Sequence, residues 1–449
     1  MTVFFHTLGC KVNQYESQVM LSQFQKLGFS LCAENEQPDV CVINSCTVTE
    51  NSDKKTQQAI NKFRRLYPET VIVLTGCFPQ AYPEKSAAIS AADIITGTSE
   101  RGCVAELAVE FFTNHKRIIH IPELSDDFEN MSIGTFEGHT RAFIKIQDGC
   151  NNFCSYCIIP YSRGKIRSKP LNIIKQELEN LANSGFKEVV FIGINLANYG
   201  KDLNVTLDPH GNCAVQGRRP PLYIDTARED NDAMCSFRGG LLTDALKIAD
   251  YTDGIKRVRL GSLEPDIIDD MKIVELSKLE KLCPHFHLSL QSGCDETLKR
   301  MNRRYDTSYY EKIVEKLRTT FENCAITTDI MVGFPGESEE EFNASLQFVE
   351  KIGFAKIHVF PYSERSGTKA AEMPDKIASN IKTERAKIMA QTAEISRKNF
   401  MQTQLGKTVK VLFETYDGKV NKGYSENYTP VSYEHHKNLT KEIHTIKIK

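Results

Sequence analysis

The tightest cluster of cysteines in the chain runs from Cys150 to Cys157. Its sequence, Cys150-Asn-Asn-Phe-Cys154-Ser-Tyr-Cys157, has C-x3-C-x2-C spacing, so one short loop can place three thiolates around one metal centre. Structural zinc sites usually combine two Cys or His knuckles, and no second knuckle follows here. Three thiolates ligate three irons of a cubane and leave the fourth iron open, whereas four make a closed electron-transfer cluster. The spacing therefore favours an iron–sulfur cluster with an open site over a structural zinc loop.

The bulk properties of the chain limit its class and its partners. Its 449 residues predict two or three domains, and its 14 cysteines favour thiolate ligands in a reducing compartment. The formal net charge of −2 means that a nucleic-acid site must be a local patch. The N-terminus lacks a basic and apolar leader, and no apolar run has the length of a membrane span. We expect a cytoplasmic protein with no membrane partner.

A second set of three cysteines is spread over the first 80 residues. Cys10, Cys46 and Cys77 each follow a different predicted strand, at residues 2–7, 40–44 and 71–75. Helical segments alternate with these strands, which predicts a parallel sheet, and sites in such sheets form beyond the carboxyl ends of the strands. Three loops would bring the thiols together at one edge. The alternative is that they are ordinary buried cysteines at strand ends.

The central region contains six predicted strands separated by amphipathic helices, which suggests a partial barrel with function at the rim after each strand. The strands are expected at residues 141–147, 189–194, 255–260, 285–290, 326–331 and 356–360. Asn195, Glu264 and Gln291 follow three of them and are candidate contacts for a bound small molecule. For each, a local hydrogen bond at the end of the strand is the competing interpretation.

Both cysteine sets, with their flanking residues, resemble the radical S-adenosylmethionine (SAM) methylthiotransferases. The resemblance lies in Thr7-Leu-Gly-Cys10-Lys-Val-Asn-Gln-Tyr-Glu-Ser17, Asn44-Ser-Cys46-Thr-Val, Thr75-Gly-Cys77 and the triplet with Tyr156. The Lys-Val-Asn sequence after Cys10 is most similar to that of the branch that acts on N6-threonylcarbamoyladenosine in tRNA. The isopentenyladenosine branch tends to have Gln-Met-Asn there, and the ribosomal-protein branch tends to have Pro-Lys-Asn.

The resemblance implies a fold class, two clusters and a reaction. The fold would be α/β, with an N-terminal parallel sheet, a partial (β/α)6 radical SAM barrel and a small C-terminal TRAM-like β-barrel. Cys10, Cys46 and Cys77 would hold an auxiliary [4Fe–4S] cluster that carries or supplies sulfur. The second [4Fe–4S] cluster, at Cys150, Cys154 and Cys157, would cleave SAM to an adenosyl radical. Methylthio would then replace hydrogen at carbon 2 of the adenosine at position 37, next to the anticodon.

The expected partners are tRNA and a reduced electron donor of the flavodoxin or ferredoxin type. SAM would lie across the rim, near Asn195, Glu264 and Gln291. At the C-terminus, short β runs interleave lysines and tyrosines, a composition that suits RNA backbone contacts and base stacking. The alternative for that region is a plain solvated β-domain.

Shifts in composition and pattern give the expected domain organisation. Residues 1–115 form the N-terminal methylthiotransferase domain, 116–140 a linker and 141–374 the radical SAM core. Residues 201–240 interrupt the core, have little periodicity and are interpreted as a flexible insert. Residues 375–405 form a connecting helix, and 406–449 form the TRAM-like domain.

Three competing functions remain open at this point. Two are methylthiotransferases with another substrate, either isopentenyladenosine in tRNA or an aspartate side chain of a ribosomal protein. The third is a non-catalytic iron–sulfur redox sensor that binds RNA, which would need the cysteines but no SAM pocket. Compared with these three, a zinc-dependent RNA-binding module is less favoured by the sequence.

Overall fold

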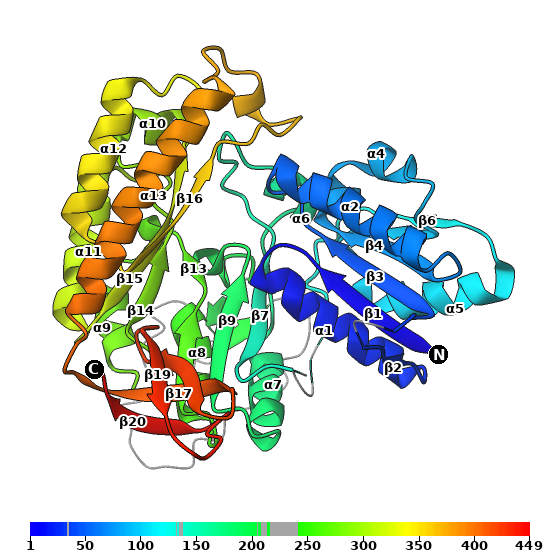
Figure 1. Ribbon diagram of the computed structural model, residues 1–449, viewed down its shortest axis with the longest axis horizontal. Helices are drawn as coiled ribbons and strands as arrows, with labels where there is room; N and C mark the ends of the chain where they lie inside the picture. The colour runs from blue at the N-terminus through cyan, green and yellow to red at the C-terminus, as the bar shows by residue number, and fades with distance from the viewer. Residues whose placement is uncertain (34–35, 132, 134–137, 204, 208–212, 216–240) are drawn as a thin grey trace.

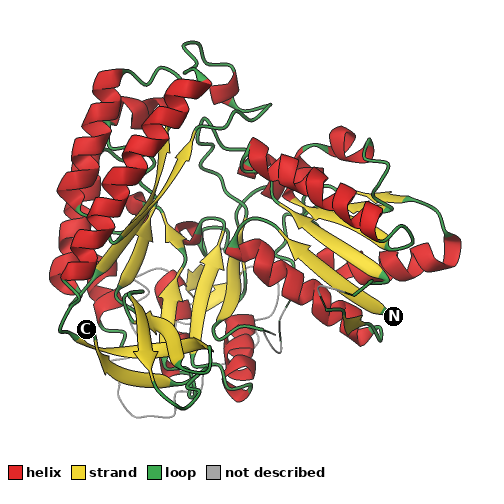
Figure 2. Ribbon diagram, viewed as in Figure 1, coloured by secondary structure: helices red, strands yellow, loops and turns green. Residues whose placement is uncertain are grey.

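The computed structural model describes residues 1–33, 36–131, 133, 138–203, 205–207, 213–215 and 241–449. Figure 1 follows the chain from an α/β unit at the N-terminus, through an open barrel, to a small curled sheet at the C-terminus. Figure 2 shows the strands as inner layers with helices along their faces. No helix among the described residues is both long and apolar enough to span a membrane.

The N-terminal unit is a six-stranded parallel sheet in the order β2-β1-β3-β4-β5-β6. Its strands are β1 (Thr2–Thr7), β2 (Ser30–Leu31), β3 (Val40–Ser45), β4 (Val71–Gly76), β5 (Ile94–Thr96) and β6 (Ile118–His120). Its helices are α1 (Lys11–Lys26), α2 (Glu50–Leu66), α3 (Cys77–Ala81), α4 (Pro83–Ala87), η1 (Arg101–Cys103) and α5 (Val104–Asn114). The parallel sheet and the strands expected at residues 2–7, 40–44 and 71–75 are confirmed. Strand β6 lies within residues 116–140, the segment interpreted as a linker.

Helices cover both faces of this sheet, which explains why β3 and β4 are buried along their whole length. On one face, Phe24 of α1 and Ala108 of α5 pack against valines of β1, β3 and β4. On the other face, Ile60 and Phe63 of α2 pack against alternate residues of β3 and β4. The Thr49 side chain caps α2 by accepting a hydrogen bond from the Ser52 amide.

The barrel has six parallel strands, in agreement with the six predicted from the sequence. They are β7 (Ala142–Asp148), β9 (Glu188–Gly193), β12 (Arg257–Leu260), β14 (His285–Leu288), β15 (Ala325–Val332) and β16 (Lys356–Pro361). Two short strands, β8 (Arg167–Ser168) and β13 (Ser262–Leu263), extend the sheets β12-β9-β7-β8 and β13-β14-β15-β16. An isolated parallel bridge between Val258 and Leu282 links the two sheets.

The outer layer of the barrel is helical, and its longest helices pack on the apolar residues of the strands. The helices are α6 (Ile159–Arg163), α7 (Leu171–Asn183), α8 (Leu241–Tyr251), α9 (Asp270–Ser277), α10 (Asp295–Arg300), α11 (Thr307–Thr320) and α12 (Glu339–Ile352). Short 3-10 turns are η2 (Leu196–Asn198), η3 (Pro265–Ile267) and η4 (Lys369–Ala371). Within residues 201–240, the structure describes an antiparallel pair, β10 (Val205–Leu207) and β11 (Cys213–Val215). The prediction of a flexible insert falls mainly on residues outside the described ranges.

Helix α13 (Ser379–Gln402) runs along β16 and α12 and leads to the C-terminal sheet. Four antiparallel strands form that sheet in the order β19-β18-β17-β20. They are β17 (Thr408–Tyr416), β18 (Val420–Ser425), β19 (Pro430–Glu434) and β20 (Ile443–Lys447), and they curl around a small core that includes Val411 and Phe413. This sheet stands where the sequence predicts the small β-domain.

The C-terminal sheet is docked on the barrel by arginines. Arg259 donates hydrogen bonds to the backbone oxygens of Ser425 and Glu426, at 2.7 and 2.5 Å. Arg257 donates to the backbone oxygens of Lys410 and Tyr424. The guanidinium of Arg259 also lies 4.0 Å from the ring centre of Tyr428. The chain end is therefore fixed to the same strands that build the barrel interior.

Candidate iron–sulfur and SAM site

Cys10, Cys46 and Cys77 are brought together at the carboxyl edge of the N-terminal sheet. They follow β1, β3 and β4, which are neighbours in the sheet order. A Cβ on Gly9 would lie 2.6 Å from the Cβ and 3.0 Å from the Sγ of Cys46, so only glycine lets these two loops approach so closely. Cys10 is exposed, whereas Cys46 and Cys77 are buried. One cysteine of the set is therefore open to solvent, and the other two are covered by protein.

The environment of Cys10 and Cys46 favours the neutral form of these two thiols in the metal-free protein. Burial, with further repulsion from Cys77 and Cys10, raises the pKa of Cys46 to about 12. Partial desolvation by the surrounding protein also raises the pKa of Cys10, and the charge of Arg163 opposes this shift. Metal binding at such thiols must displace protons, so thiolates form together with the metal site.

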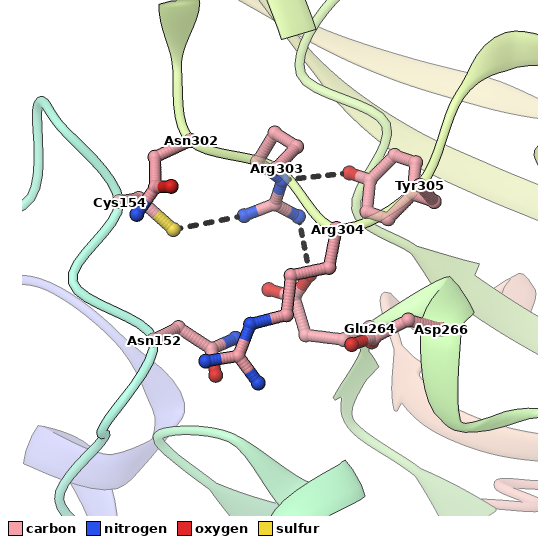
Figure 3. A pocket seen from close by; sticks show the side chains of 8 residues that line it. All are labelled: Asn152, Cys154, Glu264, Asp266, Asn302, Arg303, Arg304 and Tyr305. Carbon is pink, nitrogen blue, oxygen red and sulfur yellow. Dashed lines mark hydrogen bonds and ion pairs between the residues drawn. The ribbon is translucent and has the colours of Figure 1, made fainter. Parts of the chain in front are cut away.

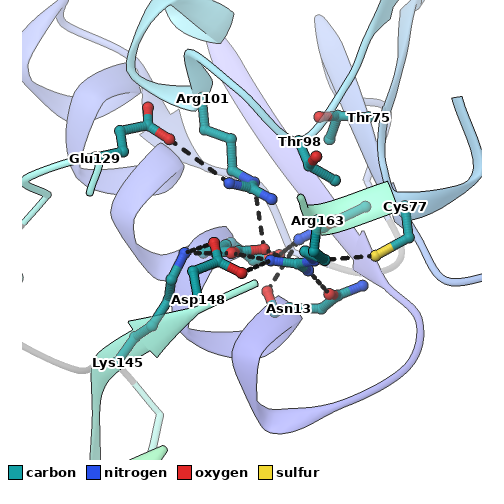
Figure 4. Close-up of polar contacts among 12 residues, drawn as sticks. Asn13, Thr75, Cys77, Thr98, Arg101, Glu129, Lys145, Asp148 and Arg163 are labelled. Atoms are coloured by element: carbon teal, nitrogen blue, oxygen red, sulfur yellow. Dashed lines mark hydrogen bonds and ion pairs between the residues drawn. The ribbon is translucent and has the colours of Figure 1, made fainter. Parts of the chain in front are cut away.

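A buried guanidinium contacts this cysteine set (Figure 4). Arg163 closes helix α6 and is fully buried. Its Nε donates to the Sγ of Cys77 at 3.2 Å, and its Nη2 donates to the Oδ1 of Asn13 at 2.7 Å. Asn13 in turn donates to the backbone oxygens of Leu8 and Ser45, next to the other two cysteines. Arg163 and Asn13 therefore hold the three loops in a fixed relation.

Glu16 is the carboxylate around which the buried cations gather. It is fully buried on α1 and pairs with Arg163 at 2.5 Å, Lys145 at 2.8 Å and Arg101 at 3.2 Å. Burial alone would raise its pKa, but the three cations outweigh that effect and lower the pKa to about 2. Glu16 stays ionised and joins α1, β7, η1 and α6.

Asp148 extends the same network to the second cysteine set. Its carboxylate lies 2.7 Å from the Nζ of Lys145 and 3.5 Å from Arg163 and Arg167. Glu129 adds a third carboxylate, 3.6 Å from Arg101. Four cations thus face three carboxylates, which leaves one surplus positive charge beside Cys77. Asp148 is two residues before Cys150, so one polar network connects both cysteine sets.

The second set, Cys150, Cys154 and Cys157, lies on the loop between β7 and α6. Helix α6 contacts α3, which begins at Cys77, so the two loops lie side by side. Burial raises the pKa of Cys157 to about 12, with Cys154 adding to the shift. All three thiols are partly exposed and therefore accessible from the rim of the barrel.

The residues after α10 hold this cysteine loop from the opposite side. The Ser155 amide donates to the backbone oxygen of Met301 at 3.0 Å, and the Asn302 side chain donates to the backbone oxygen of Phe153 at 3.1 Å. Arg303 is almost completely buried, and its Nη1 donates to the Sγ of Cys154 at 3.3 Å. A cation thus supports one thiol in each set, Arg163 in the first and Arg303 in the second.

A pocket opens beside the second cysteine set (Figure 3). It is lined by Asn152, Cys154, Glu264, Asp266, Asn302, Arg303, Arg304 and Tyr305. Arg303 forms an ion pair with Glu264 across it and donates to the Tyr305 hydroxyl at 2.8 Å. Burial raises the pKa of the Glu264 carboxyl even though Arg303 opposes the shift. Glu264 is at the predicted place, but its charge is already engaged by Arg303.

Asn195 and Gln291 have polar atoms that the described protein does not satisfy. The Nδ2 of Asn195 lies 3.7 Å from the Sγ of Cys150, while its Oδ1 is buried with no hydrogen-bond partner among the described residues. The Oε1 of Gln291 is buried and unpartnered in the same sense. A buried acceptor without a hydrogen bond destabilises the folded protein, unless a ligand supplies the missing donor. Both rim positions therefore suit the amino group of SAM.

The chain matches two family profiles in succession. Residues 2–97 match the uncharacterized protein family UPF0004, and residues 144–349 match the Radical SAM superfamily. A threonylcarbamoyladenosine tRNA methylthiotransferase MtaB of Thermotoga maritima is 35% identical, over the whole of this chain and 94% of the relative. The MtaB of Bacillus subtilis is 34% identical, over the whole of this chain and 93% of the relative.

The chain is a radical SAM methylthiotransferase of the MtaB-like family. A tRNA-2-methylthio-N(6)-dimethylallyladenosine synthase of Caldicellulosiruptor saccharolyticus is also 34% identical, over 92% of this chain and 82% of the relative. A solved radical S-adenosylmethionine methyltransferase, TsrM of Kitasatospora setae, shares the fold with a TM-score of 0.56 at 13% identity, over 82% of this chain and 77% of that one. The predicted family and fold class are confirmed.

Several polar residues of this methylthiotransferase were not identified from the sequence. The Glu16, Asp148 and Arg163 network joins positions far apart in the chain, and no local pattern marks it. No pattern in the sequence distinguishes Arg303 from a surface arginine, whereas the structure places it against Cys154. A charged residue inside an apolar segment, such as Lys145 between Ile144 and Ile146, is the signal that could have indicated a buried network.

Proposed function

We propose that this protein adds a methylthio group to carbon 2 of N6-threonylcarbamoyladenosine at position 37 of tRNA. The observation that carries the proposal is the pair of three-cysteine sets on adjacent loops, connected by one buried polar network. MtaB relatives that span the whole chain support this substrate over isopentenyladenosine or a ribosomal protein. The pocket beside Cys154 and the unpartnered polar atoms at the rim favour an enzyme over a redox sensor.

The two cysteine sets fit two [4Fe–4S] clusters with open irons. Cys10, Cys46 and Cys77 would hold one cluster, and Cys150, Cys154 and Cys157 the other. When bound, these clusters supply the electron that cleaves SAM and the site from which sulfur is transferred. The surplus positive charge beside Cys77 suits a group with three thiolate ligands. The donor set is therefore compatible with the expected cofactors.

The protein residues around the second set bind and orient SAM. Asn195 and Gln291 would accept hydrogen bonds from its amino group, since each has a buried oxygen that has no hydrogen-bond partner among the described residues. Arg303 keeps the Cys154 sulfur in place and is held in turn by Glu264 and the backbone oxygen of Ser289, the latter at 3.1 Å. The aromatic ring of Tyr156 packs against Phe334 and limits solvent access below the loop.

The C-terminal sheet offers a surface for the RNA. Rings of Tyr433, His435 and His436 follow one another with interplanar angles of 16° and 26°, and Tyr433 stacks on the buried Phe413 at 27°. Exposed lysines flank this row, namely Lys419, Lys422, Lys437 and Lys441. Stacking platforms beside lysines suit single-stranded bases and phosphates. A reduced protein of the flavodoxin or ferredoxin type would deliver electrons to the rim.

The proposal is tested by anaerobic reconstitution and assay. We expect about eight irons per chain, reductive SAM cleavage and a methylthio product in tRNA that carries N6-threonylcarbamoyladenosine. In the variant Cys150→Ala/Cys154→Ala/Cys157→Ala, iron should fall to about half and SAM cleavage should be abolished.

Other results would contradict parts of the proposal. Four irons with SAM cleavage would exclude the auxiliary cluster while keeping the radical enzyme. Methylthiolation of isopentenyladenosine tRNA in place of the threonylcarbamoyl substrate would exclude the proposed specificity. Zinc without iron would exclude the mechanism entirely.

A further inference from the structure

Lys11 is a cation beside the exposed thiol of the first cysteine set. It directly follows Cys10 and is the first residue of α1. The side chain keeps contact with solvent. Within the described ranges, its ammonium group forms no hydrogen bond or ion pair with another side chain. The nearest lysine of the buried network, Lys145, is by contrast fully paired with Glu16 and Asp148.

The charged neighbours of Lys11 belong to the strands of the barrel. Its ammonium interacts electrostatically with Arg141, Arg259 and Glu188, which belong to the segments of β7, β12 and β9. It also interacts with His285 of β14 and His358 of β16. Helix α1 contacts β7 and β9, so Lys11, at the start of this helix, lies beside the barrel strands.

The surroundings of Lys11 carry more cations than carboxylates. Glu188 is fully buried and is shared by Arg259 at 2.7 Å, Arg141 at 3.0 Å and Arg257 at 3.3 Å. Arg141 has a second carboxylate partner, Glu414 of the C-terminal sheet. The carboxylates near Lys11 are therefore already paired with arginines.

A further acidic group on a neighbouring strand also has a partner. Asp329 of β15 lies 3.3 Å from the Nε2 of His287. Arg141 and Arg259 repel the Lys11 ammonium, so a further cation is unfavourable at this place. An anion entering the barrel interior would relieve this repulsion.

We propose that Lys11 binds the carboxylate of the threonylcarbamoyl group of the substrate and thereby determines specificity. This inference rests on the proposed function. Carbon 2 and N6 of adenine belong to the same edge of the base. When carbon 2 faces the thiols beside Cys10, the N6 substituent therefore extends past the residue that follows Cys10. The threonyl carboxylate is the one anionic group of that substituent, and an uncharged isopentenyl group would leave Lys11 without a partner.

The test compares two substrates that differ only in this charge. Anticodon stem–loop RNAs would carry either N6-threonylcarbamoyladenosine or its uncharged carboxamide analogue, and kcat/KM for methylthiolation would be measured for each. We expect the wild-type protein to prefer the acid roughly 10- to 100-fold, the range of a charged hydrogen bond. Lys11→Gln should lose this preference, mainly through a lower kcat/KM for the acid.

Two further variants separate recognition from folding. Lys11→Arg keeps the charge and should retain most of the preference for the acid. Lys26→Gln removes an exposed lysine at the other end of the same helix and should behave as the wild type. Iron content per chain, measured for every variant, reports whether the adjacent cysteine set is intact.

The outcomes distinguish this inference from the proposed function. An equal loss on both RNAs in Lys11→Gln, or an undiminished preference for the acid, would overturn the role of Lys11 while leaving the function in place. A wild-type protein that does not methylthiolate the threonylcarbamoyl RNA would overturn the proposed function and this inference with it.

Discussion

Replacement of Glu16 with glutamine is expected to destabilise the protein by about 3–5 kcal/mol, because it leaves buried cations without their shared partner. Arg101 and Arg163 cannot lose a proton, so the repulsion between them cannot be relieved by deprotonation. Asp148 and Glu129 would then face the four cations. The measurement is the urea midpoint of the anaerobic, iron-loaded protein, together with its iron content.

Glu177 provides a matched control for that substitution. It is equally buried but pairs with one cation, Lys169, at 2.5 Å. Because a lysine can release its proton when its partner is lost, Glu177→Gln should cost less, about 1–3 kcal/mol. Equal shifts of the urea midpoint in the two variants would contradict the role assigned to Glu16.

Gly149→Ala is expected to remove the second iron–sulfur site. Gly149 has a φ of +70°, and a Cβ at this position would lie 1.8 Å from the backbone oxygen of Lys165 and 2.7 Å from that of Gly164. Both contacts are with backbone atoms, so the loop itself must move. Cys150 would move with it, because its amide donates to the Gly164 oxygen at 3.0 Å. Iron should fall to about half, and SAM cleavage should be lost.

Gly185→Ala separates this clash from the strain of a left-handed backbone. Gly185 has a φ of +85°, but an added Cβ would meet no atom within 4 Å. We expect a loss of roughly 1–2 kcal/mol in stability, with iron content and SAM cleavage retained. Wild-type iron and SAM cleavage in Gly149→Ala would show that the cysteine loop tolerates displacement.

The sequence predicted well those features that depend on local pattern. Short apolar runs predicted β3 and β4 because fully buried parallel strands are apolar along most of their length, and the run Val3-Phe-Phe predicted the partly buried β1. The positions of Cys10, Cys46 and Cys77 after these strands then followed from topology. The six barrel strands were recognised for the same reason.

Features that depend on contacts between distant segments were not predicted. The residue that reaches Cys77 is Arg163, 86 positions later in the chain. The sequence places Glu264 where it could contact SAM. Its ion pair with Arg303 could not be predicted, because the two residues are far apart in the sequence. Lys11 was treated as part of a family motif, and only the barrel around it reveals the excess of positive charge.

The attachment of the C-terminal sheet has a consequence for how this protein can diversify. Arg257 and Arg259 bind the sheet through backbone oxygens of residues 410 and 424–426. Because every amino acid has a backbone oxygen, these contacts do not depend on the side chains at those positions. Side chains on the outer surface of the sheet can therefore change without loosening the joint. Mutation can therefore change the outer surface of the sheet while its backbone contacts with β12 are retained.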